Sequence, residues 1–169
     1  MEGYRQLYSK MVGEDANLFF DSMINNTETV KIVSYKSIPE LKDLIDYHIK
    51  KGNKKIIKQC YQNSAETTLD VKDVDYVEGI LSYNGLPISH GWNVWKGGYY
   101  FDLTLEINER FNEEDEYYKM MVADKERLKE LILLLGVWGP FSASHYLNKD
   151  LIIPHGIWFI PNKIAILIK

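Results

Sequence analysis

Cys60, His90 and Asp102 are the residues whose types and order indicate chemistry in this chain. Cys60 is its only cysteine, so it cannot form a disulfide within the chain. A thiol is mostly protonated at neutral pH and must become a thiolate before it attacks a carbonyl carbon. A neighbouring imidazolium stabilises the thiolate, and a carboxylate behind the imidazole fixes its tautomer and orientation. The three residues therefore predict a nucleophile, a general base and an orienting carboxylate.

Each of the three residues lies in a segment with its own predicted secondary structure. Cys60 lies near the start of a helix expected over 57–67, where the helix dipole helps to stabilise a thiolate. His90 lies on a strand expected over 88–95, and Asp102 on the next strand, expected over 99–105. A group of lysines upstream adds positive charge or forms a solvated face: Lys50, Lys51, Lys54, Lys55 and Lys58.

The loop between the last two strands decides whether His90 and Asp102 share a face of the sheet. Side chains alternate between faces along a strand, so the pair requires a loop of odd length. A three-residue loop centred on Lys96 places Asp102 directly opposite His90, and one centred on Gly97 places it on the diagonal. A two-residue turn at Lys96 and Gly97 sends the carboxylate to the other face.

The segment from Lys58 to Thr104 resembles the transglutaminase-like branch of the papain-like cysteine enzymes. The resemblance rests on three short motifs: Gln59-Cys60 with an aromatic residue after it, His90 with Trp92 two positions later, and Phe101-Asp102-Leu103-Thr104. Tyr61 stands where many members of the family have tryptophan.

This resemblance implies roles for the residues of the motifs. Cys60 would be the nucleophile, His90 the general base and acid, and Asp102 the residue that orients the imidazole. The backbone N–H of Cys60 would form part of an oxyanion hole, with Gln59 as a candidate for the second donor. The fold it implies is a papain-like or transglutaminase-like core over about 57–106 with extra helices.

The rest of the chain predicts an α+β domain whose antiparallel sheet packs against the helix that carries Cys60. The segment Ser37-Ile38-Pro39-Glu40 has the pattern of a capping box and starts a helix that ends near Gly52. That helix has its apolar stripe at Leu41, Leu44, Ile45 and His48 or Ile49. Strands are expected over 29–35 and, as a three-stranded meander joined at Asn84-Gly85 and at 96–98, over 74–83, 88–95 and 99–105.

Further helices and strands are expected toward the two ends of the chain. A helix is expected over 4–23, with a break at Gly13, and the acidic segment 112–116 is expected as a solvated loop. Asp124 caps a helix that Gly136 ends. Its apolar face consists of Leu128, Leu131, Ile132 and Leu135. Two short strands are expected over 152–168.

Length and composition describe one globular domain over residues 1–169, with 46% hydrophobic and 26% charged residues. The net charge of -4 lacks the basic excess that is typical of nucleic-acid-binding proteins, so no nucleic-acid partner is expected. We expect no transmembrane helix, because no apolar run is long enough, and no secretory signal at the N-terminus of this sequence. We therefore expect a cytoplasmic protein without a membrane partner.

No cofactor and no metal are expected. His145, Asp150 and His155 carry potential metal ligands, but the nine residues between the two histidines match no usual ligand spacing. Gly97-Gly98 is expected as a turn rather than a phosphate-binding loop, because no helix or lysine follows in the right place.

Two functions from different classes fit these residues. The first is a thiol-dependent acyl-transfer enzyme that hydrolyses an amide or peptide bond of a protein, peptide or small amide through a Cys60 acyl-enzyme. Deamidation and transamidation share that intermediate. The second is a binding module of the same fold that captures a small molecule or a protein without turnover, as in conflicts between phage and bacterium. Neither function specifies an oligomeric state.

Overall fold

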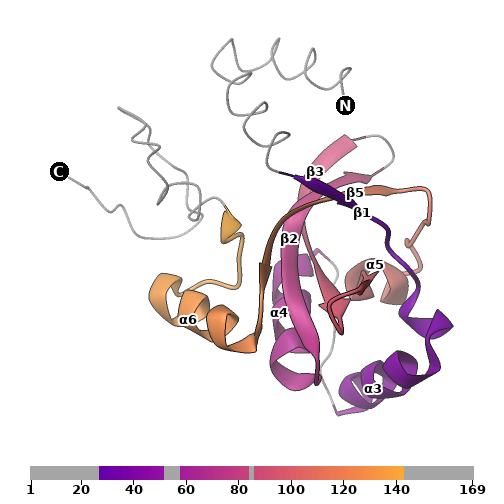
Figure 1. Cartoon of the computed structure of the whole chain (residues 1–169), viewed down its shortest axis with the longest axis horizontal. Helices are drawn as coiled ribbons and strands as arrows, with labels where there is room; N and C mark the ends of the chain where they lie inside the picture. The colour runs from indigo at the N-terminus through magenta and orange to yellow at the C-terminus, as the bar shows by residue number, and fades with distance from the viewer. Residues whose placement is uncertain (1–26, 52–57, 84–85, 143–169) are drawn as a thin grey trace, which may run out of the picture.

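The computed structural model describes residues 27–51, 58–83 and 86–142. These residues form a curled antiparallel sheet with helices packed around it, so the expected α+β class is confirmed (Figure 1). The strands are β1 (Glu28–Val30), β2 (Val74–Tyr83), β3 (Leu86–Trp95), β4 (Tyr99–Phe101) and β5 (Glu116–Ala123). The helical elements are a 3-10 turn, η1 (Tyr35–Ser37), and the α-helices α3 (Pro39–Lys50), α4 (Cys60–Asp70), α5 (Leu103–Ile107) and α6 (Lys125–Leu135).

Several expected features lie outside the described residues. They are the helix over 4–23 with its break at Gly13, the turn at Asn84-Gly85, the histidines at 145 and 155 with Asp150, and the strands over 152–168.

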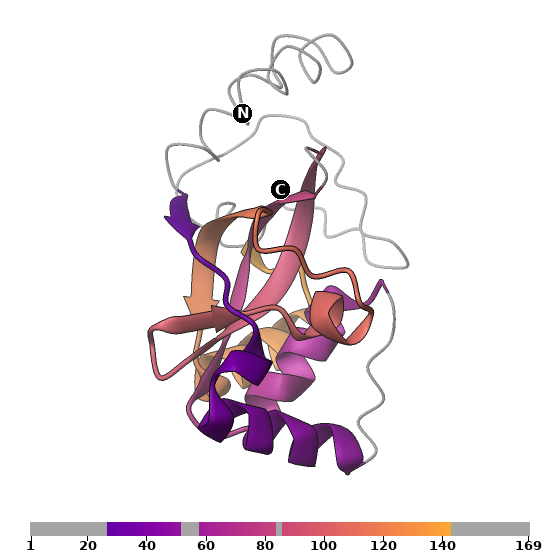
Figure 2. The same cartoon turned by 90° about the vertical axis from the view of Figure 1, so that its right-hand side faces the viewer.

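The strand order in the sheet is β1-β5-β2-β3-β4, and every neighbouring pair is antiparallel. The expected meander of β2, β3 and β4 is therefore confirmed. The sheet curls until the chain after β1 meets β4, where Ile32 bridges Tyr100 and the Val33 N–H donates to the Tyr100 carbonyl at 2.9 Å. Figure 2 shows this arrangement from the side, with the chain after β1 passing in front of the sheet.

Strand β5 is not predicted from the sequence. It lies between β1 and β2, and its pairing with β2 shifts register between Glu78 and Gly79. Met121 pairs with Glu78 and Lys119 with Gly79, so Met120 is an extra residue on β5. Such a bulge breaks the alternation of buried and exposed side chains by which a strand is recognised in a sequence.

The N-terminal part of the described chain differs from expectation in two places. The strand expected over 29–35 is confined to Glu28–Val30, because Tyr35 already begins η1. The capping box is wrong: the N-cap of α3 is Ile38, and the Ser37 hydroxyl instead donates to the Ser34 carbonyl at 2.6 Å. Proline at the first position of α3 supplies a helical φ without any side-chain cap.

The expected apolar faces of α3 and α6 are largely confirmed. In α3, Leu41, Ile45 and His48 are buried, with Leu44 and Ile49 partly buried beside them. Helix α6 begins as expected, with the Asp124 carboxylate accepting from the Arg127 N–H at 2.8 Å, and it ends at Gly136 with φ 66°. Leu128 and Leu131 are buried in α6, but Leu135 is exposed.

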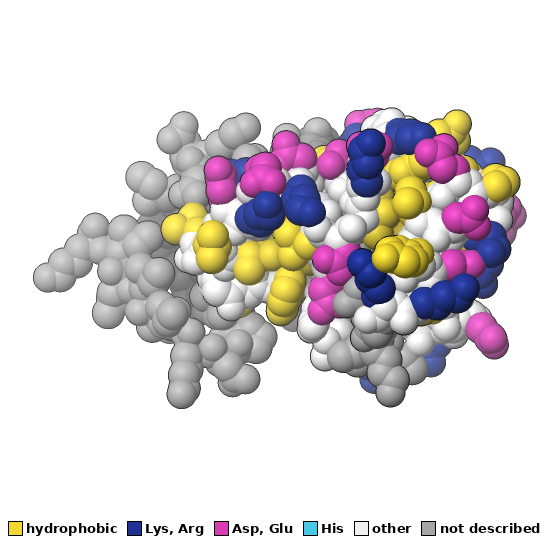
Figure 3. Space-filling model, turned by 90° about the horizontal axis from the view of Figure 1, so that it is seen from below, with side chains coloured by type: hydrophobic (Ala, Val, Ile, Leu, Met, Phe, Trp, Pro, Cys, Tyr) yellow, Lys and Arg dark blue, Asp and Glu magenta, His cyan; other side chains and the backbone are white. Residues whose placement is uncertain are grey.

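Acidic and basic side chains are mixed on the surface of the described residues. On the face shown in Figure 3, Lys and Arg side chains lie next to Asp and Glu, with small hydrophobic patches between them. Exposed ion pairs on α6 join Arg127 to Glu130 and Lys129 to Glu126. Among the described residues, no helix combines the length and the apolar character that crossing a membrane requires.

Candidate active site

Helix α4 packs against β2 and β3 through small and polar side chains rather than through an apolar stripe. Its buried residues are Asn63, Ser64, Ala65, Thr67 and Thr68. The Ser64 hydroxyl donates to the Trp92 carbonyl, and the Asn93 amide donates to the Ser64 carbonyl and to the Thr68 hydroxyl, each at 3.0 Å. These hydrogen bonds fix α4 on β3, so the position of its first residue, Cys60, is set by the sheet.

Gly91 allows the first turn of α4 to lie directly on β3. A Cβ atom at Gly91 would stand 2.9 Å from Tyr61 Cδ1 and 3.2 Å from Tyr61 Cα, distances that require the helix to move. Gly91 follows His90 directly on β3, so the first turn of α4 meets the strand at the residue next to His90. The absence of a side chain at Gly91 is thus part of what brings Cys60 to His90.

We expect Gly91→Ala to move the start of α4 away from β3. Overpacking of this kind costs about 1–3 kcal/mol, so the free energy of unfolding in urea should fall by that amount. The rate at which iodoacetamide alkylates Cys60 should fall as well. Gly98→Ala is the matched control, because nothing lies within 4 Å of a Cβ atom built there. Equal alkylation rates in both variants would contradict this role of Gly91.

The loop between β3 and β4 has the odd length that the pairing of His90 and Asp102 requires. Val94 pairs with Tyr100 and Trp95 with Tyr99, which leaves a three-residue loop centred on Gly97. Gly97 supplies a left-handed backbone with φ 66° at its centre. Of the two odd-length loops expected from the sequence, the structure contains the one that places Asp102 diagonal to His90.

Asp102 does not lie on a strand, which corrects the sequence-based expectation. Strand β4 ends at Phe101, and Asp102 is the N-cap of α5, where its Oδ1 accepts from the Leu105 N–H at 3.0 Å. The reason is local. Asp is favoured at the N-cap of a helix, because its carboxylate accepts a hydrogen bond from a backbone N–H of the first turn that has no other partner. Because the cap uses one carboxylate oxygen, the other is left for His90.

The Asp102 carboxylate is fully buried and hydrogen-bonded by three groups. Its Oδ2 lies 2.5 Å from His90 Nε2 and accepts from the Tyr117 hydroxyl at 2.9 Å, in addition to the N–H bond at the other oxygen. Burial and the charge of Asp102 raise the pKa of Tyr117, so the hydroxyl stays protonated and donates. A buried carboxylate with these partners holds the imidazole in one orientation.

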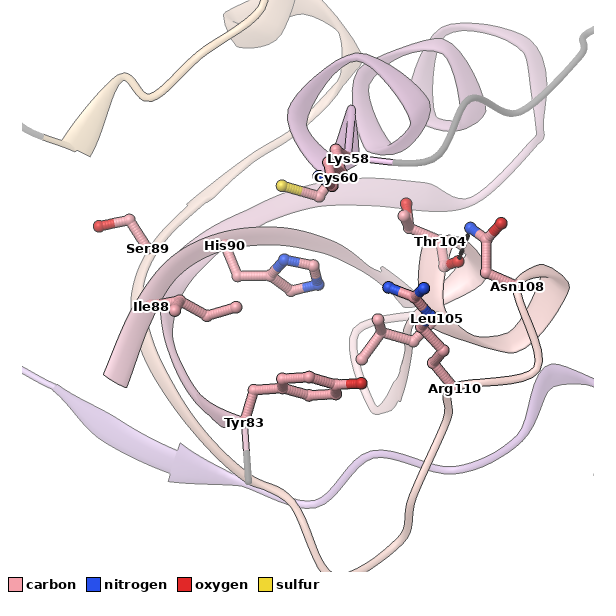
Figure 4. A pocket seen from close by; sticks show the side chains of 10 residues that line it. All are labelled: Lys58, Cys60, Tyr83, Ile88, Ser89, His90, Thr104, Leu105, Asn108 and Arg110. Carbon is pink, nitrogen blue, oxygen red and sulfur yellow. Dashed lines mark hydrogen bonds between the residues drawn. The ribbon is translucent and has the colours of Figure 1, made fainter. Parts of the chain in front are cut away.

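His90 presents its other ring nitrogen, Nδ1, to Cys60. The side chain is 4% exposed, and Figure 4 shows the Nδ1 edge of the ring on the side where the Cys60 sulfur lies. Burial, the largest single effect, lowers the pKa of His90. The charge of Asp102, its hydrogen bond and the interaction with Cys60 together outweigh burial and raise the pKa of His90 to about 10. The imidazole therefore favours its charged form between a carboxylate and a thiol.

This raised pKa makes the stability of the fold dependent on pH. Between the ordinary histidine value of about 6.5 and the folded value of about 10, folded His90 keeps a proton that the unfolded chain has lost. We therefore expect the free energy of unfolding to fall as the pH rises through this window, and the contribution to be fully present below it. Urea unfolding at a series of pH values measures the slope, and His90→Asn should flatten it. If the free energy of unfolding of His90→Asn changed with pH as steeply as that of the wild type, His90 would not be the source of the pH dependence.

A cavity of about 250 Å³ opens onto Cys60 and His90. It is lined by residues of β2 and β3, of α5 and the loop after it, and of the start of α4 (Figure 4): Lys58, Cys60, Tyr83, Ile88, Ser89, His90, Thr104, Leu105, Asn108 and Arg110. The Asn63 amide donates to the Thr104 hydroxyl at 3.1 Å and ties α4 to α5 across this site. The cavity gives a small group direct access to the sulfur.

The two candidate oxyanion-hole donors, the Cys60 N–H and the Gln59 side chain, differ in their position relative to the cavity. Cys60 is the first residue of α4, so its N–H is one of the helix N–H groups that lack an intrahelical acceptor. Gln59 is the N-cap of α4; its side chain is exposed, makes no capping hydrogen bond and does not line the cavity. The position of Cys60 thus supplies a backbone donor beside the sulfur, whereas that of Gln59 supplies no side-chain donor in the cavity.

Two residues of this site are not identifiable from the sequence. Tyr117, the second side-chain partner of Asp102, lies on strand β5, which is not predicted from the sequence, so no local pattern marks it. Arg110 lines the cavity from the loop after α5, and no local pattern marks it. Among the described residues, no group of three or more His, Cys, Asp or Glu side chains is arranged to hold a metal ion.

Comparisons with protein-family models, with curated proteins and with solved structures find no match to this chain.

Proposed function

We propose that this protein is a thiol-dependent acyl-transfer enzyme that hydrolyses an amide or peptide bond through a Cys60 acyl-enzyme. The observation that carries the proposal is the buried chain of contacts from Asp102 to His90 Nε2, with His90 Nδ1 turned to Cys60 at the mouth of a cavity. A buried cysteine that served only for packing would need neither a charged imidazole nor an opening to solvent.

The arrangement supports a two-step reaction. In the first step the Cys60 thiolate forms an S–C bond to the substrate carbonyl, the C–N bond breaks, and His90 gives its proton to the leaving amine. In the second step water adds to the thioester carbonyl and gives a proton to His90, and the S–C bond breaks to restore the thiolate. The Cys60 N–H at the start of α4 stabilises the negative oxygen in both steps.

A papain-like core of the transglutaminase-like type is part of this proposal. The supporting features are the nucleophile at the start of a helix that packs on an antiparallel sheet, and the base on a strand of that sheet. Tyr61, which packs against Gly91, fills the position where the family often has tryptophan.

Acylation by p-nitrophenyl acetate tests the proposal with a generic acyl donor. We expect a burst of p-nitrophenol, an acetylated Cys60 in the mass spectrum and slow turnover afterwards, because the acyl-enzyme must form before it is hydrolysed. Cys60→Ala should show no burst, and Cys60→Ser, which keeps the shape of the side chain, should show at most a small one. Acylation of native Cys60 no faster than that of the urea-unfolded chain would overturn the proposal and favour the binding module.

A further inference from the structure

The cavity beside Cys60 has an unusual distribution of charge. Besides His90, which is paired with Asp102, two cationic side chains line it, Lys58 and Arg110, and none of the lining residues is acidic. On the face shown in Figure 3, by contrast, acidic and basic side chains are mixed. The nearby carboxylate of Asp102 is fully buried and occupied by His90, Tyr117 and the Leu105 N–H, so it does not neutralise the cavity.

The two cations come from opposite sides of the cavity. Lys58 lies just before α4, and Arg110 follows α5; the guanidinium of Arg110 points into the cavity toward the side on which His90 lies (Figure 4). Among the described residues neither cation forms an ion pair with a carboxylate, whereas Lys42, Lys96, Lys119, Arg127 and Lys129 all do. Asn108 adds an uncharged polar group at the same wall, and Ile88, Leu105 and Tyr83 provide the apolar surface.

We propose that the substrate of this site carries a carboxylate close to its reacting carbon, and that Arg110 and Lys58 bind it. This inference rests on the proposed function and names its substrate class. A guanidinium matches the planar carboxylate with two parallel N–H donors, and a lysine adds a point charge. A cavity of about 250 Å³ holds a group the size of a side chain, so the recognised carboxylate belongs to the immediate neighbourhood of the scissile bond.

Iodoacetate and iodoacetamide test this inference, because the two reagents differ in one carboxylate. Each forms an S–CH₂ bond to the same single cysteine and releases iodide. We compare the ratio of the iodoacetate rate to the iodoacetamide rate in the folded chain with the ratio in the urea-unfolded chain. Binding of the carboxylate should raise the folded ratio about tenfold, the effect of one charge-assisted hydrogen bond. Added salt should lower it again.

Variants assign the effect to the two cations. Arg110→Gln should remove most of the increase in the rate ratio over the unfolded chain, and Lys58→Gln should remove part of it. Arg110→Lys should retain part of the increase, because the positive charge remains. Lys72→Gln is the matched control, since Lys72 is an exposed cation beyond the opposite end of α4. A ratio that is the same in the wild type, Arg110→Gln and Lys58→Gln would overturn the inference.

The same measurement separates this inference from the proposed function. Fast alkylation of Cys60 by both reagents with an unchanged ratio overturns the carboxylate substrate and leaves the thiol enzyme standing. Alkylation by both reagents no faster than in the unfolded chain overturns the proposed function, and the substrate class with it.

Discussion

We expect His90→Asn to slow alkylation of Cys60 by iodoacetamide about a hundredfold at about pH 6, because only the thiolate reacts and an ordinary thiol is almost fully protonated there. In the wild type, the His90 imidazolium keeps its charge up to about pH 10. Under the proposed mechanism, this charge stabilises the neighbouring thiolate. Without that charge the rate should rise with pH as it does for a simple thiol. Stopped-flow alkylation across a series of pH values, followed by mass spectrometry, measures both profiles.

A matched variant separates the charge of His90 from its packing. His48 is also buried and lies on α3, but it has no place in the site, so His48→Asn should leave the alkylation profile as in the wild type. Superimposable pH profiles for the wild type and His90→Asn would show that Cys60 and His90 form no functional pair.

Asp102→Asn is expected to reduce turnover of p-nitrophenyl acetate by about three to four orders of magnitude, as loss of the orienting carboxylate does in catalytic triads. The Asn side chain can still cap α5 through its oxygen, but it carries no charge to hold a proton on His90. Since burial lowers the pKa of His90 and Asp102 supplies the largest opposing effect, the pKa of His90 should fall in this variant. NMR titration of the His90 ring measures that change directly.

Tyr117→Phe is the matched control for Asp102→Asn. It removes one hydrogen bond to Oδ2 but keeps the carboxylate and its contact with His90. A hydrogen bond to a charged group contributes about 1.5–3 kcal/mol, so turnover should fall by no more than about a hundredfold. A loss as large as that of Asp102→Asn would mean that Tyr117, and not the charge of Asp102, orients the imidazole.

Local patterns in the sequence determined much of what positions the site. The alternation over 74–83 predicts β2 with its bounds, and Asp124 and Gly136 predict both ends of α6. The order of Cys60, His90 and Asp102 and the need for an odd-length loop also follow from the sequence alone. These features depend on contacts between near neighbours along the chain: side-chain alternation, capping hydrogen bonds and the φ angle of a turn glycine.

The tertiary structure alone decided the rest, because those contacts join residues that are distant in sequence. Strand β5 is recognised only when it pairs between β1 and β2, and only that pairing brings Tyr117 to Asp102. The polar residues of α4 hold the helix on β3 only through tertiary hydrogen bonds to Asn93 and to the Trp92 carbonyl. Likewise, Lys58 and Arg110 are unremarkable cations in the sequence, and the packing of α4 and α5 around His90 places both on one cavity.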